Sequence, residues 1–387
     1  MAGWHYLDHA ATTPVRPEVI AAMLPVLSDG YGNPSGAHAL ARQARAVLDL
    51  AREQLVAVVG GAPGDVVFTG GGTEADNLAV RGVLGARGGL AVCSAIEHHA
   101  VLEPVLATGG RVVGVDRRGI IDLDALADAL DPEVTLVSVM LVNNEVGTIQ
   151  PLDAVAEVVH AHAPNAVLHT DAAQALCWLD VREHAASADL VTLAAHKCGG
   201  PKGTGALLVR SGVELQPLLL GGGQERERRS GTQDVAGAVA LATAATAAAT
   251  EREALVARTS GWRDGLVDAV LAEVPGAVES AAADGDRSHL VPGIANLCLP
   301  AVDSEALLFL LEQDHHVLAS AGSSCASGAQ EPSHVLAALG VPRSVATGSL
   351  RLSLGWSTSA ADLDAATAGV LDVAVRLRTH ARDGAPA

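Results

Sequence analysis

Residues 188–197 read ADLVTLAAHK, a short apolar run that ends in His196 and Lys197. A run of this length without alternation is typical of a strand buried on both faces, as in a parallel sheet. The same plan, an apolar run closed by glycine or polar residues, returns four times: DVVFTGGG (65–72), GLAVCSAIEHHA (89–100), TLVSVMLVNNEVG (135–147) and AVLHTDAAQ (166–174).

Helical patterns such as LDALADAL (123–130) and PLDAVAEVVHAHAP (151–164) separate these runs. Alternating strands and helices predict an α/β fold with a mainly parallel sheet covered on both faces. Ligands of such sheets bind at the carboxyl ends of the strands. We therefore expect one site built from the polar residues at those ends, namely Thr73, His98, Asn144, Asp171 and Lys197.

The pattern changes after the Ala-rich stretch 235–250, which reads as a packed helix. Residues 254–274 predict a long helix, and 289–300 and 349–356 predict strands. We expect a large domain over 16–249 and a smaller α+β domain formed by 1–15 and 250–387. A Ser/Gly/Ala-rich stretch, 318–330, is typical of a mobile loop.

Composition excludes several classes of protein. The net charge is −19, and no basic run is present, so direct binding to nucleic acid is not expected. No apolar run reaches membrane-spanning length, and the first residues lack the pattern of a signal peptide. The five cysteines are odd in number and form no CxxC pair, so neither a disulfide framework nor a zinc site is indicated. We expect a cytoplasmic protein without metal.

Three features together indicate the cofactor. The sequence FTGGGTEADNLAV (68–80) takes a strand through a glycine turn into a helix, whose N-terminus either binds phosphate or is merely capped by Thr73. Asp171 is a helix cap, a metal ligand or a partner for a cationic ring nitrogen. Lys197 is a surface residue or an amine with a lowered pKa that forms a Schiff base. A phosphate anchor, a carboxylate and such a lysine are what pyridoxal phosphate requires.

Lysine usage favours the catalytic interpretation, because Lys197 and Lys202 are the only lysines among 387 residues. Arginine replaces lysine almost everywhere else and cannot form a Schiff base. His98 is either a surface residue, like its neighbour His99, or a group that stacks on the cofactor ring and transfers protons. No role follows from the sequence for Lys202.

The combined motifs resemble the cysteine desulfurases of the class V aminotransferase superfamily. The resemblance covers nearly the whole chain and rests on ten stretches in family order: YLDHAATTPV, YGNPSGAH, FTGGGTEADNLAV, EHHAVLEP, NNEVGTIQP, HTDAAQ, AHKCGGPKGTGALLV, GGGQERERRSGT, SSCASGAQEPSHVLAALG and SLRLSLGWST. It implies fold type I of the pyridoxal-phosphate enzymes, with a large domain around a mainly parallel seven-stranded sheet and a smaller C-terminal α+β domain.

The resemblance also implies the residues that hold the cofactor. Lys197 would bind it covalently, Asp171 would keep its ring nitrogen protonated, and His98 would stack on the ring and act in proton transfer. Its ring hydroxyl would lie near Gln174 and Asn144. The phosphate would be held by Gly72, Thr73 and His196, with Thr232 reaching in from the second subunit of a homodimer.

The implied reaction converts L-cysteine into L-alanine. Asn144 and Arg351 would bind the substrate carboxylate, and Cys325 in the mobile loop would take the sulfur as a persulfide. The sulfur would pass to an acceptor protein, either an iron–sulfur scaffold or an enzyme that thiolates tRNA or other molecules. The alternatives are a selenocysteine lyase, another class V aminotransferase-type enzyme, or a sulfur-relay protein that kept only the fold.

The sequence departs from the family pattern at two positions of the cofactor pocket. Ala194 stands where the family often has a serine that helps to bind phosphate, and Cys198 follows Lys197 where a bulkier apolar residue is expected. The segment beyond Arg351 is short, which leaves the identity of the acceptor open. The departures at Ala194 and Cys198 bear on cofactor binding.

Overall fold

A computed structural model describes residues 3–282, 284–321 and 333–383. Seven strands form the central sheet in the order β2-β8-β7-β6-β5-β3-β4, and all neighbours pair in parallel except β8, which is antiparallel to β2 and to β7. The mainly parallel seven-stranded sheet is therefore confirmed. Its strands are β2 (Val66–Thr69), β3 (Leu90–Ser94), β4 (Arg111–Val113), β5 (Val134–Ser138), β6 (Val167–Asp171), β7 (Leu190–Ala194) and β8 (Gly205–Val209).

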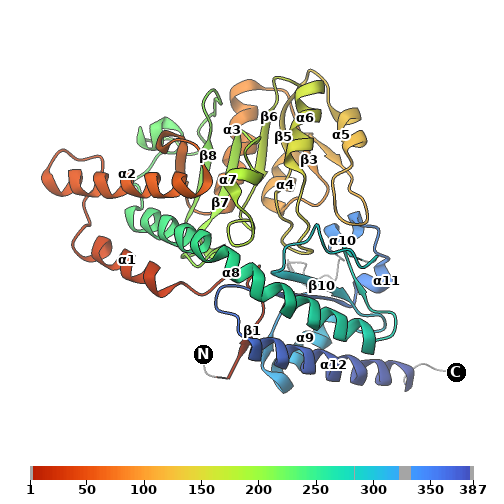
Figure 1. Ribbon diagram of the computed structural model, residues 1–387. Coiled ribbons are helices and arrows are strands. Elements are labelled where there is room, and N and C mark those ends of the chain that lie inside the picture. The colour runs from red at the N-terminus through yellow and green to blue at the C-terminus, as the bar shows by residue number, and fades with distance from the viewer. Residues whose placement is uncertain (1–2, 283, 322–332, 384–387) are drawn as a thin grey trace.

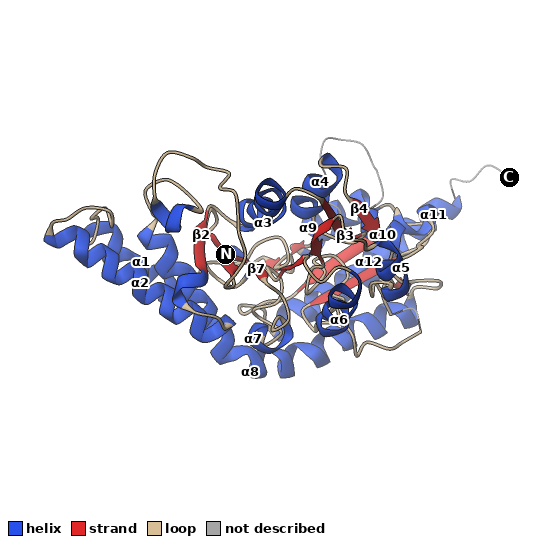
Figure 2. Cartoon of the chain, turned by 90° about the horizontal axis from the view of Figure 1, so that it is seen from above, coloured by secondary structure: helices blue, strands red, loops and turns tan. Residues whose placement is uncertain are grey.

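Helices cover both faces of this sheet, as Figure 2 shows from above. On one face, α3 (Gly72–Arg87) and α4 (His99–Ala107) share a core with Val67 and Cys93. On the other, α2 (Ala39–Val59), α5 (Leu123–Ala129), α6 (Leu152–His162) and α7 (Val181–His184) share a core with Val66 and Phe68. Neighbouring strand residues thus enter opposite cores, as burial on both faces requires.

One long helix, α8 (Val235–Glu273), runs from beside α2 and α1 to the C-terminal part of the chain (Figure 1). Its alanine-rich first half packs against α2 and α1 (Pro17–Ser28), because small side chains allow close approach. Its second half, with Leu266 and Val270, enters a different core. The sequence predicted two helices here; the structure has one, because no proline or buried glycine interrupts the helix-forming residues near 250.

The second core belongs to the smaller, C-terminal sheet, whose order is β12-β10-β9. Its strands β9 (Val278–Glu279), β10 (Ile294–Cys298) and β12 (Ser349–Ser353) are antiparallel, and α9 (Ser304–His315) and α12 (Ala360–Asp383) pack beside them. The other short elements include β1 (His5–Tyr6), which pairs with β11 (Val317–Leu318), the helices α10 (His334–Ala338) and α11 (Arg343–Ala346), and the 3-10 helices η1 (Pro63–Asp65) and η3 (Gln224–Glu227). A smaller C-terminal domain is therefore present, whereas the exact division at residue 250 stays a prediction.

Candidate active site

A cavity of about 210 Å³ opens at the carboxyl ends of the central strands. Eight of the twelve lining residues are among those predicted from the sequence: Gly72, Thr73, His98, Asn144, Asp171, Gln174, His196 and Lys197. The other four are Asp76, Met140, Ala173 and Ala194. Parallel strands bring these distant segments to one edge, as expected.

Lys197 ends a 3-10 helix, η2 (Ala195–Lys197), directly after β7. Its ammonium group donates to the carbonyl oxygens of Ala10 at 2.6 Å and Ala11 at 3.0 Å. Burial and, after it, the charge of Arg351 lower the pKa of Lys197 to about 8, against the opposing charges of Asp171 and Asp8. About a tenth of the amine is therefore unprotonated at pH 7, far more than for a lysine of ordinary pKa, and a nucleophilic amine requires this form.

Asp171 is the last residue of β6 and is 7% exposed. One carboxylate oxygen accepts the backbone N–H of Ala173 at 2.8 Å. Burial raises the pKa of Asp171, and the interactions with His98, with the Ala173 N–H and with Lys197 oppose that rise. A cationic partner placed in this cavity would stabilise the ionised carboxylate.

His98 precedes α4 as its N-cap, and its Nδ1 accepts the backbone N–H of Ala100 at 3.1 Å. This contact places the proton of the neutral ring on Nε2. Burial lowers the pKa of His98, and the charge of Lys197 lowers it as well. The side chain is thus a neutral imidazole that lines the cavity and can accept or donate a proton there.

The anion-binding end of the cavity is built on the start of α3. Gly71, with φ of +135°, is the N-cap, and no side chain caps this helix. The alternative in which Thr73 serves as the N-cap is therefore wrong, because Thr73 lies within the first turn of α3. The N–H groups of that first turn have no partner within the helix and can bind an anion.

His196 lies at the same end, and its Nδ1 is 3.2 Å from the hydroxyl of Thr12. Burial lowers the pKa of His196 to about 4, and the charges of Lys197 and Lys202 add to this effect. The exposed Lys202 therefore lies near enough to act on His196 electrostatically. Sequence reasoning had assigned no role to Lys202.

Three predicted site residues do not line the cavity. Thr232 is exposed on the surface. Arg351 is 5% exposed and lies beside the cavity, where it donates to the backbone oxygen of Asn144 at 2.9 Å. Cys325 lies outside the described residues.

The N-terminal segment contributes more than the sequence indicated. Gln174 donates to the carbonyl oxygen of Ala10 at 2.8 Å, and Thr13 donates to the carbonyl oxygen of His196 at 2.9 Å. These backbone acceptors follow from no sequence pattern, although the motif YLDHAATTPV drew attention to the segment. Residues 8–13 consequently form one wall around Lys197.

Two buried acids near Asp171 were also missed. Asp76 and Glu97 are 2% and 0% exposed, and each has one carboxyl oxygen without a hydrogen-bond partner among the described residues. Burial raises the pKa of each carboxyl well above its usual value. Burial therefore favours the neutral form of each acid, which limits the negative charge around Asp171. The polar residue within the helical stretch TEADNLAV was the only signal for Asp76.

The two departures from the family pattern have local explanations. Ala194 lines the cavity beside Gly72. A Cβ added to Gly72 would lie 3.4 Å from the methyl carbon of Ala194, so the two residues are in close contact. Cys198 is 1% exposed, and burial raises the pKa of its thiol above the usual value. An unreactive thiol at this position serves packing.

The site has the donor set that pyridoxal phosphate requires. It offers a buried amine of lowered pKa, a buried carboxylate, a neutral imidazole and an uncapped helix N-terminus around a single cavity. No cluster of three His, Cys, Asp or Glu side chains suited to a metal ion occurs among the described residues.

Comparisons with known proteins agree with this geometry. The family "Aminotransferase class-V" matches residues 5–366. An IscS-like cysteine desulfurase of Mycobacterium tuberculosis is 43% identical, covering 93% of this chain and 94% of the relative. A cysteine desulfurase IscS of Dictyoglomus turgidum is 38% identical, covering 93% and 91%. A solved structure of a NifS-like protein is similar with a TM-score of 0.88 and 31% identity, covering 96% and 100%.

Within residues 3–282, 284–321 and 333–383, no helix is both long and apolar enough to cross a membrane.

Proposed function

The chain belongs to the aminotransferase class-V family as one of its pyridoxal-phosphate-dependent cysteine desulfurases, and on that premise we propose which of its residues perform the reaction. L-cysteine is the substrate, and its sulfur is transferred to an acceptor. The single observation that carries the residue assignments is the cavity that joins Lys197, Asp171, His98 and the start of α3.

When bound, pyridoxal phosphate withdraws electrons from the α-carbon of the amino acid attached to it. Lys197 provides the amine that binds the cofactor aldehyde, and its burial supplies the unprotonated form. Asp171 holds a proton on the ring nitrogen by pairing with its charge. The first N–H groups of α3, with Thr73 and His196, bind the phosphate.

His98 is the group that we assign to proton transfer. Its Nδ1 is occupied by the Ala100 N–H, so Nε2 is the atom that gives and takes the proton. Because burial keeps the ring neutral, it can accept a proton near neutral pH. Gln174 and Asn144 complete the wall that orients the ring.

Cys325 is the residue that we assign to sulfur transfer. Its sulfur attacks the sulfur of the bound cysteine, an S–S bond forms, the C–S bond breaks, and the β-carbon takes a proton to give L-alanine. Support comes from the other four cysteines, which form no disulfide and are buried in the hydrophobic clusters of the chain. Burial raises the pKa of each of these thiols, to about 11 for Cys177, so they are poor nucleophiles at neutral pH.

We propose a homodimer in which Thr232 completes the phosphate site of the partner. Exposed apolar side chains of the kind that a protein interface buries occur on α1, on α2 and in two loops: Ile20, Leu24, Leu27, Tyr31, Leu50, Leu219 and Leu220. Leu220→Glu should dissociate the dimer in light scattering, whereas Leu106→Glu, an equally apolar exposed position on α4, should leave it intact. A dimeric Leu220→Glu variant would contradict this interface.

We propose a cytoplasmic enzyme whose sulfur acceptor is an iron–sulfur scaffold or a thiolation enzyme. The four described cysteines are free, as expected in a reducing compartment. The net charge of −19 disfavours direct delivery to nucleic acid. A protein acceptor is therefore the expected recipient of the sulfur.

The lysine assignment is tested by reduction with borohydride, which makes the bond between amine and cofactor permanent. Peptide mass spectrometry of the reduced holoenzyme should find the pyridoxyl group on Lys197 and none on Lys202. Lys197→Ala should neither retain covalently bound cofactor nor form alanine from L-cysteine, while Lys202→Ala should retain both. A pyridoxyl group on Lys202 would refute the assignment.

A further inference from the structure

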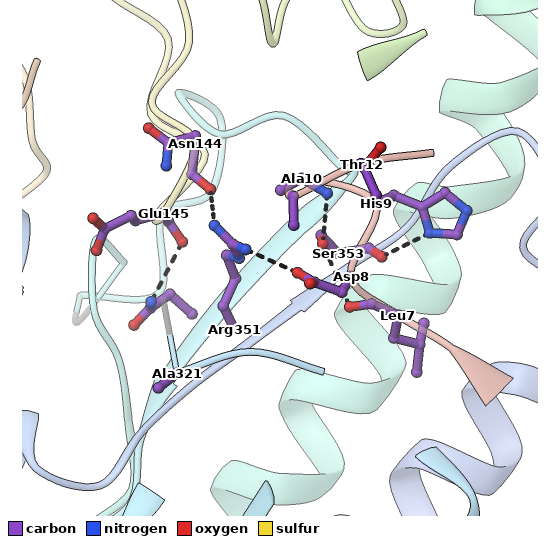
Figure 3. Close-up of polar contacts among 12 residues, drawn as sticks. Leu7, Asp8, His9, Ala10, Thr12, Asn144, Glu145, Ala321, Arg351 and Ser353 are labelled. Carbon is purple, nitrogen blue, oxygen red and sulfur yellow. Dashed lines mark hydrogen bonds and ion pairs between the residues drawn. The ribbon is translucent and has the colours of Figure 1, made fainter. Parts of the chain in front are cut away.

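Arg351 makes two hydrogen bonds within the protein in addition to the contact with the substrate carboxylate that we propose for it. It lies in the middle of β12 opposite Asn296, and its guanidinium is almost fully buried. Nη1 donates to the backbone oxygen of Asn144 at 2.9 Å, and Nη2 donates to Oδ1 of Asp8 at 2.8 Å (Figure 3). Nε has no hydrogen-bond partner among the described residues. The group is thus fixed on two sides while donors stay free, which a buried guanidinium tolerates only at a cost.

Asp8 is placed by the backbone around it. Ser353, two residues after Arg351, donates its N–H to the oxygen of Leu7 at 2.7 Å and accepts the N–H of Ala10 on its hydroxyl at 2.9 Å. The Tyr6 hydroxyl donates to the Asp8 carbonyl at 3.0 Å. Asp8 and Arg351 therefore lie on two neighbouring segments in fixed register, and Figure 3 shows the carboxylate facing the guanidinium.

The ion pair also lies close to the reacting amine. The charges of both Arg351 and Asp8 act on Lys197, whose ammonium bonds to the backbone two and three residues beyond Asp8. The side chain of Asp8 is 23% exposed, against 5% for Arg351. Within the ion pair, the carboxylate of Asp8 is therefore closer to solvent than the guanidinium that it binds.

A long arginine side chain that binds a ligand must first be immobilised, and fixing it in advance lowers that cost. We propose that Asp8 is a positioning residue for the substrate: together with the Asn144 carbonyl it fixes the guanidinium of Arg351 in the orientation that receives the carboxylate of L-cysteine. Asp8 itself contacts neither the carboxylate nor the amino group. This inference rests on the proposed role of Arg351.

The test uses two ligands that differ in the carboxylate alone. L-Alanine has the carboxylate and the amino group, and ethylamine has the amino group only. Their inhibition constants are measured with the holoenzyme against L-cysteine turnover, together with KM and kcat. For Asp8→Ala, we expect KM and the alanine constant to rise about tenfold, with kcat and the ethylamine constant changed less than about twofold. Asp8→Asn keeps an oxygen that can accept from Arg351, so it should restore most of the affinity.

Control variants separate this inference from the proposed function. Arg351→Ala should raise the inhibition constant of L-alanine more than Asp8→Ala does. The double variant should have the same inhibition constant as Arg351→Ala, since Asp8 acts only through the guanidinium. Asp362→Asn breaks another ion pair of the N-terminal segment, the 2.8 Å pair with His5, and should leave all constants unchanged. Cofactor absorbance and thermal unfolding identify any variant that is misfolded. If Asp8→Ala is misfolded, Asp8→Leu replaces it as the deciding variant, because leucine keeps a similar volume but accepts no hydrogen bond from Arg351.

Three results would overturn the proposal. If Arg351→Ala weakens the binding of L-alanine and Asp8→Ala does not, Asp8 has no positioning role, although the role of Arg351 stands. If Asp8→Ala strengthens the binding of L-alanine, the aspartate competes with the substrate carboxylate for Arg351. If Asp8→Ala weakens the binding of ethylamine as much as that of L-alanine, Asp8 acts on the amino group or on the fold. An Arg351→Ala variant with unchanged affinity for L-alanine would refute the role of Arg351 itself.

Discussion

The lowered pKa of Lys197 leads to a quantitative prediction about the enzyme without cofactor. An ordinary lysine has a pKa of 10.5, and burial brings that of Lys197 to about 8. At pH 7.5, about a quarter of the Lys197 amines are then unprotonated, compared with about one in a thousand for an ordinary lysine. We expect the amine to react about two hundredfold faster with pyridoxal phosphate than a lysine of unshifted pKa and equal intrinsic reactivity.

The sign of the pH dependence follows from the direction of the shift. Because the neutral amine is the nucleophile, the rate of cofactor uptake should rise with pH and level off above about 8. The charge of Arg351 lowers this pKa and that of Asp8 raises it. Arg351→Gln should therefore move the midpoint to higher pH, and Asp8→Asn should move it to lower pH.

The assay removes the cofactor, adds it back across a pH series and follows the visible absorbance of the covalently bound form. Brief labelling with an amine-specific reagent, read by peptide mass spectrometry, measures Lys197 directly, with the denatured chain as the reference. A midpoint near 10, or Lys197 labelling at pH 7.5 no faster than in the denatured chain, would refute the reasoning from burial.

Three further predictions concern cofactor binding and the packing that supports the site. Asp171→Asn removes the only charge proposed to pair with the cofactor ring, so kcat for alanine formation should fall by at least about a hundredfold with the protein still folded; unchanged kcat would remove Asp171 from the mechanism. The Arg52 guanidinium lies 2.7 Å from the buried Glu225 carboxylate, and Arg52→Ala removes this charge partner. The free energy of unfolding, measured with urea, should fall by about 3–5 kcal/mol. The control Arg42→Ala, at an exposed position, should lower it by less than about 0.5 kcal/mol. Gly205→Ala would place a methyl group 2.6 Å from the backbone of Gly71, so the start of α3 must shift and the dissociation constant of pyridoxal phosphate should rise; Gly265→Ala, with open space around it, should leave that constant unchanged.

The central sheet and most of the cavity could be predicted from the sequence, because both depend on local patterns. Apolar runs identify buried strands, and the residue that ends such a run lies at the edge where parallel strands meet. Asp171, His98 and Lys197 were assigned to one site on this basis, and they do line one cavity. Their catalytic roles depend on chemistry that the cavity permits, and the experiments above test them.

Contacts between remote segments could not be predicted in this way. Asp8 and Arg351 are 343 positions apart, and the register that pairs them is set by backbone hydrogen bonds between the N-terminal segment and β12. The carbonyl oxygens that hold Lys197 carry no signal in the sequence, since every residue has one. Burial of Asp76 and Glu97 likewise depends on how α3 and the segment before α4 pack against the sheet.

The central claim is that this desulfurase carries sulfur on Cys325, and incubation with L-cysteine tests it most directly. Holoenzyme treated with L-cysteine in the absence of reductant, then alkylated and digested, should contain one extra sulfur atom on the peptide with Cys325 and release an equal amount of L-alanine. Cys325→Ala should keep its bound cofactor and lose the persulfide and sustained alanine formation. A persulfide on one of the four buried cysteines, or wild-type alanine formation by Cys325→Ala, would contradict the account.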